Sequence, residues 1–290
     1  MKILMTGSHG FVGTNLMDAL SGEHEMIRWD VRSDDPLPEV DVVIHLAGKA
    51  HDVKSDGRGQ MEEYMKINFG LTQKIFDYFI AQSKCKKFIF FSSIKAKDDD
   101  TPYAQSKKAA EDYILKTDIT HIANKWVYIL RPCMIHGKGV KGNFPLLFNW
   151  VKKGWPWPLA AFENQRSYAS MGNVSFVVDG LIKKEVPSGI YNICDDEMVS
   201  TNELIALMGE CIGHKPKMLR IPKSIVRLGA KIGDGLHLPL NTERLLKLTG
   251  DYVVDNSDIK HALGIHQMSV RATDGLKTTI CSMIENQVSW

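Results

Sequence analysis

Cysteine is scarce in this chain and poorly placed for structural chemistry. Five cysteines stand among 290 residues, at wide spacing and without any C-x-x-C pair. An odd and scattered set predicts neither a disulfide framework nor a cysteine zinc site, and we expect no metal.

Long apolar runs are missing as well. No stretch reaches the length needed to cross a bilayer, and a strand-like segment starts almost at the first residue, which leaves no room for a signal peptide. We therefore expect a cytoplasmic protein without a membrane partner.

The chain also lacks an excess of charge of one sign. Its net charge is +2 and its lysines occur in scattered pairs, so we expect no nucleic-acid partner. The run Asp98–Asp100 could bind a cation, but three adjacent carboxylates cannot all face one ion, and a solvated loop fits better.

What the chain does contain begins with glycine. The apolar run Ile3–Met5 leads into Gly7, Gly10 and Gly13, and a segment with helical apolar spacing follows from Phe11. In a strand–turn–helix unit such glycines allow a tight turn, close approach of a pyrophosphate, and tight packing of the helix on the strand. The helix N-terminus then faces the phosphates. The spacing differs from G-x-G-x-x-G, so the match is to a relative of that dinucleotide-binding motif.

Strand-like and helix-like segments alternate through the first half, which predicts a parallel sheet covered on both faces. The expected strands are 25–29, 41–47, 87–91, 126–130 and 189–194, and the expected helices are 60–82, 102–117 and 174–184. The fold class expected is α/β, a Rossmann-type doubly wound parallel sheet with a smaller mixed C-terminal lobe. The dinucleotide-binding domain would span 1–137, with 174–194 returning to it, and the substrate lobe would span 138–173 and 195–290.

Asp30 follows the second expected strand. A carboxylate at this place accepts hydrogen bonds from the adenosine ribose and repels a 2′-phosphate, which favours NAD over NADP. Arg28 and Arg32 could each pair with such a phosphate, so NADP is not excluded. A polar residue that merely ends a strand is an equally good interpretation of Asp30.

Tyr103 and Lys107 lie four residues apart and would share one helix face. A tyrosine with a pKa near ~10 is a poor base at neutral pH, but a neighbouring ammonium favours the phenolate. Such a tyrosine could take a proton from a hydroxyl whose carbon loses a hydride. The Y-x-x-x-K pattern alone is weak, and its position after a strand that ends at Ser92-Ser93 strengthens it.

At this point the chain resembles the extended short-chain dehydrogenase/reductases, and within them the nucleotide-sugar epimerase/dehydratase group. The motifs that carry the resemblance are Thr6-Gly7-x-x-Gly10-Phe11-Val12-Gly13, Asp41-Val42-Val43-Ile44-His45-Leu46-Ala47, Asn68-x-Gly70, Phe90-Phe91-Ser92-Ser93, Tyr103-x-x-x-Lys107 and Leu130-Arg131-Pro132.

The resemblance implies a role for each group of residues. Tyr103 would be the acid/base, Lys107 would tune it and hold the nicotinamide ribose, and Ser93 would hydrogen-bond the reacting sugar oxygen. Cofactor contacts are implied for Gly7, Gly10, Phe11, Val12, Gly13, Asp30, Leu46, Ala47, Gly48 and Asn68, in addition to Tyr103 and Lys107. Substrate contacts are implied for Ser93, Asn143 and Pro158, for Arg166, which would bind the diphosphate of the substrate, and for Arg244 as a second diphosphate contact.

The implied activity is an NAD-dependent 4-epimerisation of a nucleotide sugar, with a uridine diphosphate hexose as first choice, through a transient 4-keto sugar. A 4-keto-sugar reductase that consumes NAD(P)H would use the same residues, and a non-catalytic cofactor sensor would need none of Ser93, Tyr103 and Lys107. The resemblance also allows a homodimer.

Three departures from the family pattern concern the substrate. Only nine residues separate Ser93 from Tyr103, and the connection from Asp30 to Asp41 is short. Met134 and His136 stand where many relatives have asparagine and tyrosine. His136 could contact substrate, but a packed or solvent-facing histidine fits as well.

Overall fold

The structure is a computed structural model that describes residues 1–30, 36–49, 60–97, 101–117, 124–236 and 241–288. The chain divides into two compact units. Unit 1 consists of Met1–Cys133, Asn173–Cys194 and Asp255–Gln267, and unit 2 of Met134–Gly172, Asp195–Val254 and Met268–Trp290. The segment 255–267 thus belongs to unit 1, whereas the sequence analysis assigned it to the C-terminal lobe. Helix α10 within this segment packs on strand β8, which explains the difference.

Unit 1 contains a six-stranded sheet in the order β2-β1-β3-β4-β5-β8, and every neighbouring pair is parallel. Its strands are β1 (Lys2–Thr6), β2 (Glu25–Trp29), β3 (Val42–His45), β4 (Lys87–Phe91), β5 (Trp126–Pro132) and β8 (Gly189–Ile193). All residues of β3 and β4 are buried, as expected of central strands with helices on both faces.

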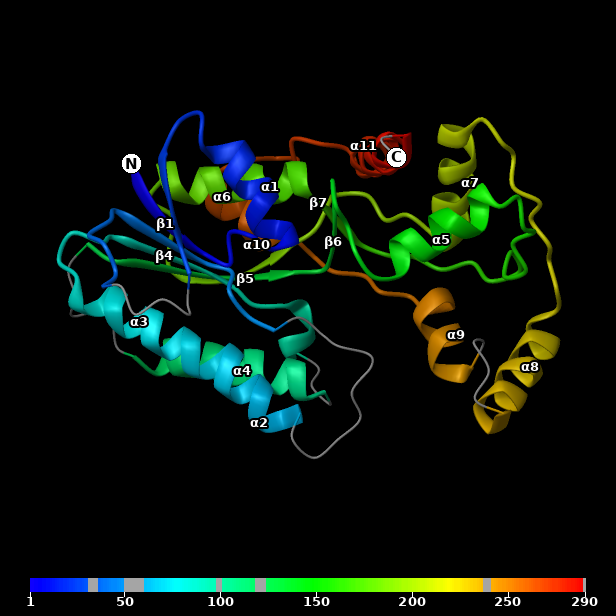
Figure 1. Cartoon of the computed structure of the whole chain (residues 1–290), viewed down its shortest axis with the longest axis horizontal. Coiled ribbons are helices and arrows are strands. Elements are labelled where there is room, and N and C mark those ends of the chain that lie inside the picture. Colours follow the sequence, from blue (N-terminus) through cyan, green and yellow to red (C-terminus); the bar gives the residue numbers. More distant parts are fainter. Residues whose placement is uncertain (31–35, 50–59, 98–100, 118–123, 237–240, 289–290) are drawn as a thin grey trace. The chain divides into compact units, whose positions relative to one another are not determined.

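Helices cover both faces of this sheet (Figure 1). One face carries α1 (Phe11–Leu20), α6 (Met171–Lys183) and α10 (Ser257–Leu263), and the other carries α2 (Gln60–Tyr64), α3 (Leu71–Ala81) and α4 (Pro102–Lys116). The second face holds an aromatic core in which Phe76, Phe79 and Phe88 contact one another. The expected α/β class with a parallel doubly wound sheet is confirmed.

The segment 60–82, expected as one helix, is interrupted by a π-helical turn over Met65–Gly70. A π turn inserts one extra residue and rotates the side chains within it. Here it directs the buried amide of Asn68 away from its own helix, toward Lys49 and Ser106. Apolar periodicity could not have shown this, because the residues on either side keep helical spacing.

Unit 2 combines a small parallel pair of strands with five helices among its described residues. The strands are β6 (Met134–His136) and β7 (Tyr168–Ser170), and the helices are α5 (Asn143–Lys152), α7 (Thr201–Ile212), α8 (Lys223–Leu236), α9 (Thr242–Thr249) and α11 (Ala272–Val288). Ser200 caps α7, and Glu203 completes the capping box.

His136 is fully buried in unit 2. Its Nδ1 lies 2.9 Å from the Thr279 hydroxyl, its Nε2 lies 3.5 Å from the Asp195 carboxylate, and its ring stacks on Phe144. Of the interpretations weighed for this histidine, the packed one matches the structure.

Candidate active site

The three glycines at the end of β1 have different surroundings. Gly7 has φ +70°, and a Cβ on it would lie 2.7 Å from the backbone nitrogen of Ala47. A Cβ on Gly13 would lie 2.3 Å from the carbonyl oxygen of Gly7. Both positions are therefore closed to any side chain, since backbone atoms cannot give way.

Gly10 is the open position of this loop. It is exposed, caps the N-terminus of α1, and has only the Gly7 carbonyl oxygen, at 3.3 Å, near the place of a Cβ. Exposed backbone at a helix N-terminus is what a pyrophosphate requires, and Phe11 and Val12 begin that helix. The loop thus fits the phosphates of a dinucleotide.

The adenosine side of this loop is defined by fewer residues. Asp30 directly follows β2 and is exposed, as is Arg28. Arg32 lies outside the described residues. Of the three residues that bear on the choice between NAD and NADP, the structure thus describes Asp30 and Arg28.

Leu46, Ala47 and Gly48 follow β3 and pass beside the glycine loop. The amide of Ala47 donates to the Thr6 hydroxyl over 3.2 Å. A Cβ on Gly48 would lie 2.8 Å from Asn68 Oδ1 and 3.4 Å from Lys107 Nζ. This segment therefore connects the glycine loop to the residues of the Tyr103 helix.

Tyr103 lies in the first turn of α4. Thr101 caps this helix through its side chain and Pro102 occupies its first turn, which is the expected chemistry of a helix start. Tyr103 is partly buried, and its ring meets the buried Tyr64 edge-on at 6.1 Å between centroids. Burial raises the pKa of the Tyr103 phenol, a side-chain hydrogen bond from Ser93 opposes that rise, and Tyr64 adds to it. Ser93 and Tyr103 are thus brought together, and without ligand the phenol is protonated at neutral pH.

Lys107 is buried one turn further along α4. Its Nζ donates to the Phe91 carbonyl over 2.8 Å and lies 4.9 Å from the centre of the Phe90 ring. Burial lowers the pKa of Lys107 to about 8, although the nearby Glu111 carboxylate acts in the opposite direction. The ammonium therefore remains charged at neutral pH, in a site where water screens it little.

Sequence reasoning missed the group that supports this lysine. The fully buried Glu111 accepts hydrogen bonds from the guanidinium of Arg131 through both of its oxygens, and Ser92 donates to it as well. These three residues join α4 to the ends of β4 and β5. The available signal was the position of Glu111 four residues after Lys107, on the same helix face.

A second group missed by the sequence analysis is a chain of hydrogen bonds through His45. Thr72 donates its proton to the Asn68 carbonyl over 2.6 Å, so Thr72 can only accept from His45 Nε2, at 3.0 Å. His45 Nδ1 then accepts from Thr6, at 2.7 Å. Burial, assisted by the charge on Lys107, lowers the pKa of His45 to about 3, so the ring is neutral.

Asn68 connects this series of hydrogen bonds to α4. Its Oδ1 accepts from the Lys49 amide over 2.7 Å, and its Nδ2 donates to the Ser106 hydroxyl over 2.9 Å. Ser106 in turn donates to the Tyr103 carbonyl over 2.7 Å. Hydrogen bonds therefore run from the glycine-loop strand β1 to the helix that carries Tyr103 and Lys107.

The four residues expected to bind the substrate nucleotide all lie in unit 2. Asn143 is the exposed first residue of α5, Pro158 is partly buried before Leu159, and Arg244 is exposed in the first turn of α9. Arg166 donates from Nη1 to the carbonyls of Lys247 at 2.6 Å and Gly250 at 3.4 Å, at the C-terminal end of α9. Part of the Arg166 guanidinium is thus used to hold the helix that carries Arg244.

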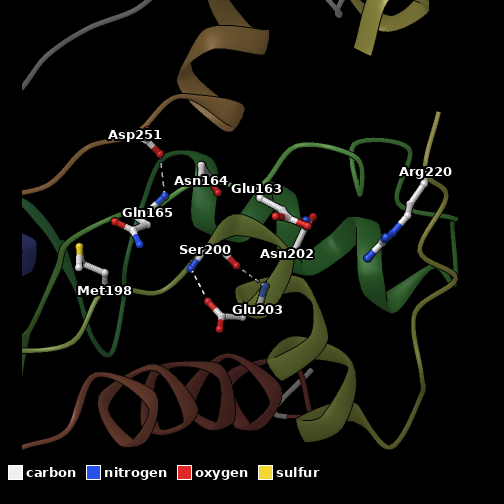
Figure 2. A pocket seen from close by; sticks show the side chains of 9 residues that line it. All are labelled: Glu163, Asn164, Gln165, Met198, Ser200, Asn202, Glu203, Arg220 and Asp251. Atoms are coloured by element: carbon white, nitrogen blue, oxygen red, sulfur yellow. Dashed lines mark hydrogen bonds between the residues drawn. The ribbon is translucent and has the colours of Figure 1, made fainter. Parts of the chain in front are cut away.

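Unit 2 also contains a pocket of about 690 Å³ (Figure 2). Its lining includes the three residues that precede Arg166 in the sequence. Glu163, Glu203 and Asp251 contribute carboxylates to its lining, against the single cation of Arg220. The Ser200–Glu203 capping box already occupies donors of the α7 N-terminus (Figure 2). An acidic lining disfavours a diphosphate, and none of the four expected substrate residues lines this pocket.

One group of potential metal ligands occurs among the described residues, formed by Glu23, His24 and Asp179 in unit 1. The ammonium of Lys183 lies 2.6 Å from Glu23 and 2.8 Å from Asp179. The Lys183 ammonium thus contacts both carboxylates and offsets one of their two negative charges.

Comparisons with known proteins agree with the fold and the motifs. The sequence profile of the NAD dependent epimerase/dehydratase family matches residues 3–194. A UDP-glucose 4-epimerase of Vibrio cholerae is 28% identical over 303 aligned positions, which cover 91% of this chain and 90% of that protein. A UDP-2-acetamido-2,6-beta-L-arabino-hexul-4-ose reductase of Pseudomonas aeruginosa is 33% identical over 50% of this chain and 38% of its own length.

Solved structures show the same fold. A UDP-glucuronic acid 4-epimerase of Bacillus cereus, determined in complex with NAD, superimposes with a TM-score of 0.73 at 18% identity, over 98% of this chain and 99% of the other. The family profile covers well over half of the chain and ends with the last strand of the parallel sheet. The chain therefore belongs to the NAD dependent epimerase/dehydratase family.

Proposed function

We propose that this chain is an NAD-dependent nucleotide-sugar 4-epimerase that acts on a uridine diphosphate hexose through a transient 4-keto sugar. The observation that carries this proposal is the grouping of Ser93, Tyr103 and Lys107 beside a glycine loop that suits a pyrophosphate. Similarity to the Vibrio cholerae UDP-glucose 4-epimerase over nearly the full length of both chains supports the substrate class.

The cofactor would be held by the loop at Gly7, Gly10 and Gly13, by Asp30 at the ribose, and by the segment Leu46–Gly48. When bound there, NAD would accept a hydride from the hexose carbon and later return it to the other face of the ketone. Lys107 has three donors, of which the Phe91 carbonyl takes one, so it can also hold a ribose hydroxyl.

Tyr103 moves the proton in both halves of this reaction. It accepts the proton of the sugar hydroxyl as the ketone forms, and it returns the same proton to the oxygen when the alcohol is restored. Burial raises the pKa of the Tyr103 phenol. To act as a base near neutral pH, Tyr103 therefore needs nearby positive charge, which the Lys107 ammonium and the oxidised nicotinamide ring of bound NAD would supply. Ser93, hydrogen-bonded to Tyr103, would position the reacting oxygen.

For the substrate diphosphate we propose Arg166, with Arg244 as a second contact and with Asn143 and Pro158 near the nucleotide. A guanidinium has five N–H donors, so the Arg166 contacts to α9 leave donors for phosphate oxygens. Arg166→Lys should raise KM with little change in kcat, because Lys cannot make the bidentate contact.

The direct test is to incubate the full chain with NAD and UDP-galactose and to follow the sugar signals by NMR. We expect UDP-glucose to form, and Tyr103→Phe to reduce the rate by about 10²-fold or more. Tyr113→Phe is the matched control, because Tyr113 lies on the same helix and donates to Asp77 at the surface. Equal rates for Tyr103→Phe and the unmodified chain would contradict the mechanism.

A second candidate is a nucleotide 4-keto-sugar reductase, favoured by the similarity of half of this chain to the Pseudomonas aeruginosa enzyme. A reductase consumes one reduced cofactor per product, whereas an epimerase leaves the nicotinamide absorbance unchanged. Stoichiometric loss of that absorbance with a 4-keto sugar, together with no interconversion of UDP-hexoses, would replace the epimerase by the reductase.

A further inference from the structure

Helix α8 exposes a row of large apolar side chains in unit 2. Ile225, Leu228, Ile232 and Leu236 have exposed fractions of 60%, 60%, 52% and 65%. We call these four residues the α8 stripe. Their spacing of three, four and four residues places them within an arc of about 80° on the helix, given 3.6 residues per turn.

The stripe is separate from the face by which α8 packs on unit 2. That face consists of Val226, Ala230 and Gly233, which are buried. Because the packing face is already filled, the stripe does not serve the core of the unit. Exposed apolar rows of this kind mark a binding surface.

Basic side chains are frequent on α8 and in the segment that leads to it. Residues 215–236 contain six lysines and arginines but only one acidic residue, Asp234, whereas the whole chain carries a net charge of +2. All six are exposed, namely Lys215, Lys217, Arg220, Lys223, Arg227 and Lys231. On the helix, Arg227 and Lys231 flank the stripe on the side opposite the packing face.

We propose that α8 lies in the surface of an anionic membrane, with the α8 stripe among the acyl chains and the basic residues at the headgroups. An amphipathic helix with a basic polar face is the recognised form of such a contact, and lysine stems let the charges reach the headgroups. None of the described helices is long and apolar enough to span a bilayer, so the contact is with one surface. The expectation of no membrane partner rested on missing spans, which do not bear on a surface helix.

Charge decides between a membrane and a second copy of this chain. A symmetric dimer through the stripe would bring the two rows of basic side chains toward each other, and repulsion would oppose it. An anionic surface is attracted by the same charges, by roughly fivefold in affinity for each basic residue near it.

The test is flotation of the full chain with vesicles of phosphatidylcholine alone or mixed with phosphatidylglycerol. We expect the chain to float with the mixed vesicles only, and added salt to release it. Leu228→Ser combined with Ile232→Ser should weaken binding by about tenfold or more, because apolar burial is lost. Leu146→Ser, at a position that is 67% exposed on α5, should leave binding unchanged.

The electrostatic part has its own pair of variants. Arg227→Gln combined with Lys231→Gln should weaken binding to the mixed vesicles. Lys84→Gln combined with Lys116→Gln removes the same charge at exposed positions of unit 1 and should change it far less. All variants alter exposed residues, so their thermal unfolding should match that of the unmodified chain.

Absence of flotation with the mixed vesicles would overturn the proposal, as would binding that the stripe variant leaves unchanged. Light scattering provides the remaining arm: a dimer that the stripe variant dissociates would assign the stripe to a second copy and also overturn the proposal. The assay needs no sugar substrate, so its outcome does not depend on the proposed epimerase activity.

Discussion

Lys107 donates a hydrogen bond of 2.8 Å from its ammonium to the backbone carbonyl of Phe91, the last residue of β4. The charge is therefore held inside the protein by a main-chain atom, and the carboxylate of Glu111 acts to raise the pKa that burial lowers. Such a lysine binds its proton less tightly than it does in the unfolded chain.

This difference predicts a rise in stability at alkaline pH. The pKa of Lys107 is about 8 in the folded state against an ordinary value of 10.5. Between these values the unfolded chain holds more protons than the folded one, so the free energy of unfolding increases with pH. Relative to Lys107→Met, the unmodified chain should gain about 3 kcal/mol across this window, measured by urea unfolding. Equal slopes in the two proteins would show that Lys107 does not titrate there.

His45 predicts the corresponding effect in acid. Its pKa is about 3 in the folded state and 6.5 ordinarily, so the unfolded chain takes up the proton first as pH falls. Stability contributed by the neutral ring is complete above pH 6.5 and is lost as pH falls toward 3. Down to about pH 4 the loss should reach about 3 kcal/mol, and His45→Gln should remove it. His266→Gln, at an exposed histidine, serves as the control.

Two glycine substitutions in the loop should have different effects, one on stability and the other on NAD binding. Gly13→Ala places a Cβ 2.3 Å from a backbone oxygen and should lower the unfolding temperature sharply. Gly10→Ala meets only one atom, at 3.3 Å, and should fold normally but bind NAD more weakly in a calorimetric titration. Unchanged NAD affinity in Gly10→Ala would exclude the open position as the phosphate contact.

The buried pair of Glu111 and Arg131 predicts strong coupling in a double-mutant cycle. Glu111→Met leaves the guanidinium without its partner and should cost about 3–5 kcal/mol in denaturant unfolding. Adding Arg131→Met should restore part of that loss, because the double variant leaves neither charge unpaired. The exposed pair of Glu243 and Lys247 on α9 is the control, and Glu243→Gln there should cost no more than about 0.5 kcal/mol. Additive losses at Glu111 and Arg131 would mean that the two do not act as a pair.

The sequence was a good guide where one residue type answers one local requirement. Apolar runs of strand length predicted the parallel sheet, and Gly7 and Gly13 stand where backbone atoms exclude any side chain. Tyr103 and Lys107 share a helix whose start is encoded by Thr101 and Pro102.

Contacts between distant segments were not predictable from pattern alone. Glu111 finds Arg131 twenty positions later, and His45 connects two threonines from different elements. Nothing in the periodicity of 60–82 distinguishes a π turn from a regular one. Arg166 shows the same limitation, since its hydrogen bonds to the end of α9 depend on how a segment some eighty residues away folds back.

The order of the strands along the chain determines when each edge of the sheet can be covered during synthesis. Strand β5 ends at Pro132 and its sheet neighbour β8 begins only at Gly189, so a ribosome must add the whole of 133–188 before that edge of the sheet can be covered. Helix α10, which packs on β8, follows later still, from Ser257. During synthesis the open edge of β5 would be a place where another unfinished chain or a chaperone could pair. The order of the segments thus leaves this edge of the sheet uncovered until 189–193 has been synthesised.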